Sequence, residues 1–257
     1  MNHVDLLWHE FRFGLLGVRR SPFALMLGFL FPFAFLLIFN VVGDASGRPA
    51  LELDRSEFTV AAVSVFAIAT SAYFNMSLGV VNAREKGLLR RVRAMSAAPG
   101  THLVARGLVV AAVTSVSLAL MTFLSIVVFG LPVDALLPAR LLLLVVIATF
   151  AAAALGVAVS SLAAGIEAGM VIYSASLFPV LFLSGVFFPL GDGFPAVLDT
   201  VVKLLPFYWM AELARWTFQP AYIGSGWQLA VVVLVGWGLA ASLVARWTVG
   251  WLPRSGR

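Results

Sequence analysis

Long apolar stretches alternate with short charged ones along the whole chain. Six stretches contain at least 18 predominantly apolar residues and at most one charge, the length at which a helix crosses a hydrocarbon core of about 30 Å. No soluble-looking block interrupts them, so the sequence predicts an all-α integral membrane protein with a single transmembrane domain over residues 1–257. The predicted spans are Pro22–Val42, Phe58–Val81, Leu103–Leu131, Leu141–Ser161, Ala168–Phe188 and Trp227–Ala245.

Composition supports the same class. Hydrophobic residues make up 61% of the chain and charged residues 11%, against roughly 45–50% and about 25% in soluble domains. The chain has no cysteine, which excludes disulfides, thiolate metal sites and thiol nucleophiles. The net charge is +5, and the basic residues lie beside the spans. Cytoplasmic retention of basic loops and contact with anionic lipid therefore explain this charge better than binding to nucleic acid does.

Basic residues are distributed unevenly between the two sides of the predicted spans. Twelve of them lie on the side of the chain ends and five on the other side. Loops rich in Lys and Arg stay in the cytoplasm, so we expect a multi-pass cell-membrane protein with both termini cytoplasmic. The five on the outer side are Arg48, Arg55, Arg140, Lys203 and Arg215.

Residues 1–20 form an amphipathic pattern before the first span. Apolar side chains recur with helical spacing, and the charged ones fall outside their stripe. This predicts a helix in the cytoplasmic membrane interface, serving either as a plain anchor or also as a contact for a cytoplasmic partner. The apolar stripe consists of Val4, Leu7, Trp8, Phe11, Leu15 and Val18.

The cytoplasmic loop 82–101 contains a second, shorter amphipathic pattern. Leu88, Val92 and Met95 share one helical face, and Arg90 and Arg91 occupy the rest. Such a helix could simply rest on anionic headgroups. Glu85 favours a protein partner instead, because a lipid anchor gains nothing from an acid.

Residues 189–218 are apolar but broken by Pro189, Pro195 and Pro206. The segment is too interrupted to span and too hydrophobic for a solvated loop. Irregular backbone at membrane depth persists only when it is buried in protein or faces water. We therefore expect an outer re-entrant region of two short helices, with a surface hairpin as the alternative.

Several kinds of chemistry are missing from the sequence. No acid or histidine lies at a span centre, where ion-coupled carriers keep such groups. There is no HExxH pair and no GxSxG elbow, so we predict neither a catalytic residue nor a metal site. The phosphate-binding GxxxxGK[ST] loop is also missing. If ATP drives this protein, another polypeptide binds it.

Two runs in this order resemble a known family: "REKGLLRRVRAMSAAP" at 84–99 and "LSGVFFPL … LPFYWMAELAR" at 183–215. With six spans, they make the whole chain similar to the type-2 permeases of ATP-binding-cassette exporters, which move drugs, lipids or glycans. The resemblance implies a separate ATPase subunit that binds ATP and Mg, a second permease copy or paralogue, and surrounding lipid. This chain would then hold no cofactor and would not itself be an enzyme.

The resemblance also assigns roles to residues. The basic segment would be the coupling helix that docks on the ATPase, through Glu85, Lys86, Leu88, Arg90, Arg91, Val92 and Met95. Substrate would pass along the second and fifth spans, where the expected lining is Phe66, Thr70, Tyr73, Tyr173, Ser176 and Ser184. Small hydroxylated residues mixed with aromatics also serve helix packing in lipid, which explains the same pattern. Two alternatives to an ATP-driven exporter stay open: a carrier or channel working without ATP, and a membrane scaffold or immunity protein.

Overall fold

A computed structural model describes residues 3–22, 26–45, 55–88, 99–187, 196–219 and 226–248, and every regular element in these ranges is a helix. Five helical runs among them are long and apolar enough to cross a membrane. These runs are Ser56–Glu85, His102–Phe129, Leu137–Ser160, Ile166–Leu183 and Trp227–Thr248. The chain is therefore a multi-pass membrane protein.

The first predicted span corresponds to a shorter apolar helix. The π-helix η1 (Met26–Leu30) leads directly into α3 (Phe31–Ala45), and the apolar part of this run is Gly28–Asn40. This stretch is shorter than the five long runs. The layout of six crossings accordingly stays a prediction.

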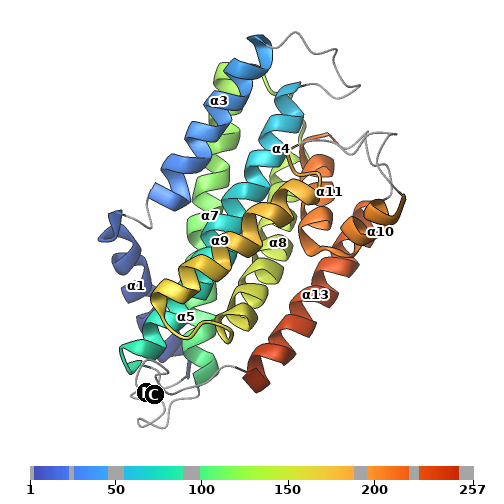
Figure 1. The fold of residues 1–257 in the computed structure, drawn as a ribbon. Helices are drawn as coiled ribbons and strands as arrows, with labels where there is room; N and C mark the ends of the chain where they lie inside the picture. The colour runs from blue at the N-terminus through green and yellow to red at the C-terminus, as the bar shows by residue number, and fades with distance from the viewer. Residues whose placement is uncertain are drawn as a thin grey trace.

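The second predicted span is the central column of the fold. It consists of α4 (Arg55–Ile68), the π-helix η2 (Ala69–Phe74) and α5 (Asn75–Glu85) in direct succession. This run is the most enclosed of the five, because α3, α7 (Pro99–Phe129), α8 (Leu137–Ser160) and α11 (Pro206–Phe218) all pack against it. Figure 1 shows the column between α3 and α7 on one side and α11 on the other.

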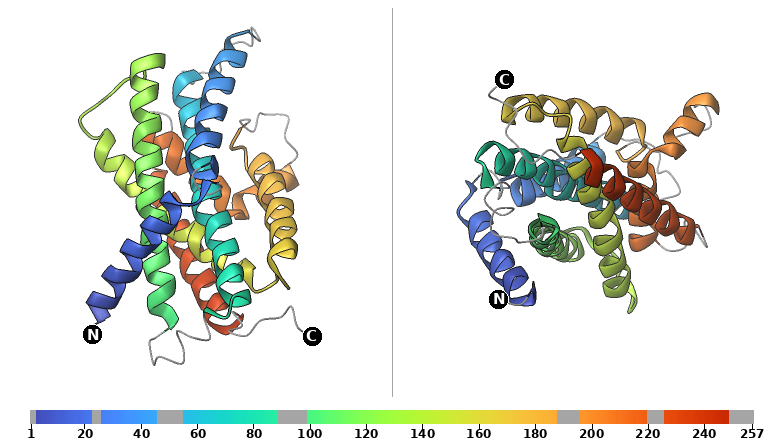
Figure 2. Two further views of the ribbon diagram at one scale, coloured as in Figure 1. Left: turned by 90° about the vertical axis from the view of Figure 1, so that its left-hand side faces the viewer. Right: turned by 90° about the horizontal axis from the view of Figure 1, so that it is seen from below.

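The long helices alternate in direction. Down the view of Figure 1, α4, α5, α8 and α13 (Trp227–Thr248) descend, whereas α3, α7 and α9 (Ile166–Leu183) rise. The start of α1 (His3–Arg19) and the end of α13 lie at the same end of the bundle (Figure 2). We call this end, where α5 ends and α9 begins, the α1 end, and the opposite one the α11 end.

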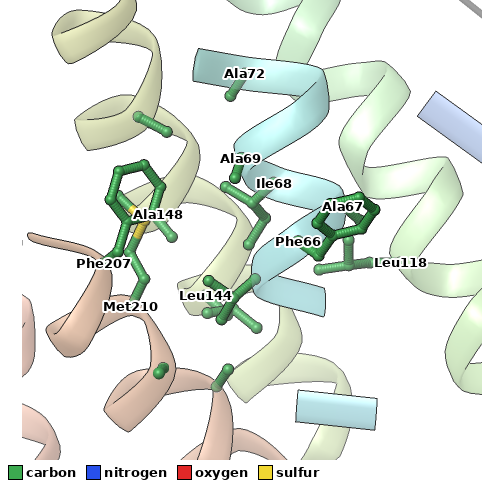
Figure 3. Close-up of a cluster of buried hydrophobic side chains, with 14 of the residues drawn as sticks. Phe66, Ala67, Ile68, Ala69, Ala72, Leu118, Leu144, Ala148, Phe207 and Met210 are labelled. Atoms are coloured by element: carbon green, nitrogen blue, oxygen red, sulfur yellow. The ribbon is translucent and has the colours of Figure 1, made fainter. Parts of the chain in front are cut away.

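Apolar side chains from the column, α7, α8 and α11 form the core (Figure 3). Ile68 and Ala72 of the column face Leu144 and Ala148 of α8, with Met210 of α11 beside them. All five are buried. Small residues such as the alanines let neighbouring helices approach closely, which is how helices associate when lipid removes the hydrophobic driving force.

The outer surface of the bundle is apolar as well. Phe123 and Val127 on α7 are each 65% exposed, and Val232 on α13 is 66% exposed. A water-soluble protein rarely presents large apolar patches of this kind. Their abundance along the long helices fits a surface in contact with lipid.

The predicted N-terminal helix forms as α1 and packs across α7. A Cβ added at Gly14 would lie 2.6 Å from Cγ2 of Val109, so the glycine permits this close crossing. Trp8 is 61% exposed and Phe13 is 68% exposed. That α1 lies in the membrane interface remains a prediction supported by these two side chains.

The predicted outer region contains two short helices, α10 (Ala196–Leu204) and α11. Pro206 opens α11, where its missing N–H costs nothing. α11 packs inside the bundle against α4, α8 and α13. Two helices are present as expected, and their entry into the outer leaflet stays a prediction.

Candidate functional site

The candidate coupling segment begins where α5 ends, at the α1 end. Gly87 has a φ of +67°, a left-handed conformation that glycine adopts without steric cost and that commonly terminates helices. Beyond the last turn, Lys86 and Leu88 are exposed, Leu88 to 41%. This end of α5 therefore offers one cation and one apolar side chain at the surface.

Of the other predicted coupling residues, the structure describes only Glu85. Arg90, Arg91, Val92 and Met95 lie outside the described residues. Glu85 is only 10% exposed and pairs with Arg84 Nε at 3.2 Å, so within the chain it already has a partner. The coupling assignment itself stays a prediction.

Arg84 is the residue at this site that the sequence reasoning missed. Its side chain is 1% exposed. Nη2 donates a hydrogen bond to the carbonyl oxygen of Ala163 at 2.5 Å, and Nη1 makes a longer contact, 3.5 Å, with that of Ser160. Because the guanidinium carries five donors in a rigid fork, one side chain ties the end of α5 to the link between α8 and α9.

A signal for this burial exists in the sequence. Arg84 lies seven residues after Ser77, so the two share one face of α5 at helical spacing. Ser77 Oγ lies 2.7 Å from the carbonyl oxygens of both Tyr73 and Gly156, and that face is therefore the one packed on α8. Arg84 is also one of the basic residues of the predicted cytoplasmic loop, and that assignment does not predict its burial.

Three predicted pathway residues come together between the second and fifth spans. The hydroxyl groups of Tyr73 and Ser176 are 2.7 Å apart. Since Ser176 Oγ donates to the carbonyl oxygen of Tyr173 at 3.1 Å, the Tyr73 hydroxyl is the donor of this bond. The rings of Tyr73 and Tyr173 meet edge to face, with centroids 6.2 Å apart.

The remaining pathway residues are buried within the chain. Phe66 is 3% exposed and packs against Phe35 with ring centroids 4.8 Å apart. Thr70 Oγ1 donates back to the carbonyl oxygen of Phe66 at 2.9 Å, and Ser184 is fully buried just after α9. In a single chain all these residues contribute to packing, and their contact with substrate stays a prediction.

Close approach of α8 to the column depends on Gly156. A Cβ at this position would lie 2.5 Å from the carbonyl oxygen of Tyr73 and 2.8 Å from Ser77 Oγ. Both contacts are fixed by backbone or by hydrogen bonds. The α8 interface therefore holds the same tyrosine that reaches α9 through its hydroxyl.

Two buried arginines connect neighbouring segments at the α11 end by hydrogen bonds. Arg140 at the start of α8 contacts both carboxylate oxygens of Asp134 at 2.8 Å and donates from Nε to the carbonyl oxygen of Thr217 at 2.9 Å. This hydrogen bonding holds the pKa of Asp134 below its usual range. Arg215 pairs with Glu212 and donates to the carbonyl oxygen of Gly185, which joins α11 to the segment after α9.

The chemistry that these sites permit is limited. In the ranges that the structure describes, no group of three or more His, Cys, Asp or Glu side chains could hold a metal ion. The arginines use their donors on carbonyl and carboxylate oxygens of the chain itself. These hydrogen bonds connect neighbouring helices and the segments between them.

Comparisons with known proteins give one family. The family model described as ABC-2 type transporter matches residues 6–218. This match covers most of the N-terminal amphipathic segment, the whole of the loop 82–101, the central column, α9 and α11. No curated protein matches the chain.

Proposed function

From the premise that the chain belongs to the ABC-2 type transporter family, we propose that it is the membrane-spanning permease subunit of an ATP-binding-cassette exporter. A separate subunit binds and hydrolyses ATP, and the permease moves an amphiphilic substrate such as a drug, lipid or glycan out of the cell. The family match over most of the chain carries this proposal. The absence of a GxxxxGK[ST] loop in the sequence supports a separate ATPase.

The coupling step starts at the end of α5. The ATPase contacts the segment from Glu85 to Met95, with Leu88, Val92 and Met95 in a groove of the partner and Arg90 and Arg91 at its rim. The exposure of Leu88 supports this contact. Because Glu85 pairs with Arg84 in the chain, its contribution is to hold the end of α5 as well as to contact the partner.

Force on this segment moves more than one helix. Arg84 joins the end of α5 to the α8–α9 link through Ala163, and Tyr73 joins the column to α9 through Ser176. A displacement of α5 is thereby passed to α8 and α9 together. ATP-driven closure of the ATPases switches the permease from inward to outward access, and a second permease, identical or paralogous, completes the pathway along the second and fifth spans.

Vesicles containing the chain and its ATPase test this function. ATP-dependent uptake of a fluorescent amphiphile should require both subunits, and Arg91→Ala should leave ATP hydrolysis while abolishing uptake. Glu85→Ala should also uncouple, and its unfolding temperature must be measured because it disturbs Arg84. Normal uptake by the Arg91 variant would refute the coupling role.

Two results would favour the alternatives instead. Uptake by the chain alone, without ATPase, would identify a carrier or channel. No uptake of any tested amphiphile, together with no association with an ATPase, would favour a scaffold or immunity protein.

A further inference from the structure

A cavity of about 780 Å³ lies under α1, at the α1 end of the bundle. Its walls come from α1, the column, α7 and the start of α9. None of the predicted pathway residues lines it. Apolar side chains, among them Phe13, Leu78, Val109 and Met170, cover part of the wall, while Arg106 and Lys86 bring positive charge.

Arg106 is the unusual member of this wall. Nη2 donates a hydrogen bond to the carbonyl oxygen of Asn75 at 3.3 Å. Nε is buried, and it has no hydrogen-bond partner within the described ranges. A cationic group that buries one of its donors without an acceptor is costly unless an anion or acceptor meets it. Arg106 Nε therefore has a hydrogen-bond donor that a bound ligand could use.

Glu10, which lines the cavity, already pairs with a histidine. Glu10 Oε2 lies 2.9 Å from His102 Nδ1, and between the described side chains no ion pair joins Glu10 to Arg106. Arg106 and Lys86 together outweigh this single carboxylate. The cavity therefore favours an anionic ligand.

Gly79 fixes where the guanidinium lies. A Cβ at this position would fall 1.6 Å from Nη2 and 2.3 Å from Nε of Arg106, so the guanidinium rests directly on the backbone of α5. Any larger residue would push it away. Gly79 and Asn75 hence form a cradle for the cation on the face that borders the cavity.

The position of the cavity identifies the kind of anion. α1 leaves Trp8 61% exposed outside the cavity and carries the exposed cations Arg12 and Arg19, which is the pattern of a helix at the level of lipid headgroups. Basic pockets between helices near this level bind anionic headgroups. The apolar part of the wall is suited to acyl chains.

We propose that this cavity binds an anionic membrane lipid, whose phosphate accepts hydrogen bonds from Arg106 and whose acyl chains lie along Val109 and Met170. The lipid would bridge α1, α5 and α7 on the side of the chain that carries the coupling segment. This site is separate from the substrate pathway along the second and fifth spans, and binding there needs no ATPase.

Lipid binding to the purified full-length chain in mild detergent tests the site. Phosphatidylglycerol and phosphatidylcholine with identical acyl chains are titrated separately, and bound lipid is counted by native mass spectrometry. The wild-type chain should prefer phosphatidylglycerol by about tenfold, because both lipids present a phosphate to Arg106 but only phosphatidylglycerol carries a net negative charge that the cations of the cavity attract. Arg106→Gln should abolish this preference, whereas Arg12→Gln, which removes an exposed charge outside the cavity, should keep it.

A second variant keeps the test decisive if Arg106→Gln fails to fold. Gly79→Ala displaces the flexible end of Arg106 without removing its charge, so the chain should fold and still lose most of the preference. An equal preference in wild type, Arg106→Gln and Gly79→Ala would overturn the proposal. So would displacement of phosphatidylglycerol by glycerol 1-phosphate at equal concentration, because the occupant would then be a soluble anion.

Discussion

Nη2 of Arg84 lies 2.5 Å from the carbonyl oxygen of Ala163, and this hydrogen bond fastens the end of the second span to the link between the fourth and fifth. Both residues are buried, Arg84 to 1% exposure and Ala163 completely. The bond lies within two residues of the exposed Lys86. The end of α5 is therefore connected directly to the α8–α9 link.

Replacing Arg84 should destabilise the chain markedly. In Arg84→Ala the carbonyl oxygen of Ala163 loses its buried donor, at a cost of about 2–3 kcal/mol, which corresponds to a decrease of roughly 5 °C in the unfolding temperature. Arg84→Lys should recover part of this loss, since one ammonium cannot replace the guanidinium fork. Thermal unfolding in detergent measures both, with the exposed Arg20→Ala as the unaffected control.

Gly156→Ala should separate α8 from the column. The added methyl group would meet the carbonyl oxygen of Tyr73 at 2.5 Å, and overpacking of this kind costs about 1–3 kcal/mol. Gly236→Ala in α13 is the matched control, because a Cβ there has no atom within 4 Å. If both variants unfold at the wild-type temperature, the close contact at Gly156 is not present in the protein.

The hydrogen bond between Tyr73 and Ser176 should be detectable as coupling. A double-mutant cycle of Tyr73→Phe and Ser176→Ala isolates this interaction, and hydrogen bonds between membrane helices average about 0.6 kcal/mol in such cycles. Unfolding free energies of the four proteins give the coupling value. Additive effects of the two substitutions would show that the second and fifth spans are not joined here.

Stability should depend on the ionisation of Asp134. Its pKa is lowered mainly by the hydrogen bonds from Arg140, so the folded state favours the carboxylate. The resulting stabilisation is fully present above the unfolded pKa of about 3.9 and is lost as the pH falls through the lower folded value. The difference in unfolding temperature between wild type and Asp134→Asn should be constant from pH 7 to pH 5 and should shrink below about pH 4. A difference that is unchanged at acidic pH would contradict the pairing.

Apolar length alone predicted where the long helices lie. The expected span Trp227–Ala245 corresponds to α13 at Trp227–Thr248, and the expected Phe58–Val81 lies within the column. The expected span Leu141–Ser161 starts directly after the charged residue Arg140, whereas α8 begins at Leu137. The structure includes Arg140 in α8, where Asp134 and Thr217 satisfy its donors.

Other features depend on contacts between distant residues and are not encoded in a local pattern. The π-helical turns η1 and η2 each require knowledge of which helix lies opposite. The resemblance implies a substrate pathway along the second and fifth spans, which stays a prediction, and the structure shows that Tyr73 and Ser176 of these spans meet within one chain. In the proposed function the pathway needs a second permease, and contacts between two chains are not encoded in the local pattern of one of them.

In the proposed function the end of α5 faces the cytoplasm and contacts an ATPase. Because the chain has no cysteine, Leu88→Cys gives a single reporter at an exposed position. A membrane-impermeant maleimide should label it in inside-out vesicles but not in intact cells, and bound ATPase should protect it. Labelling from outside intact cells, or labelling that the ATPase does not reduce, would contradict the account.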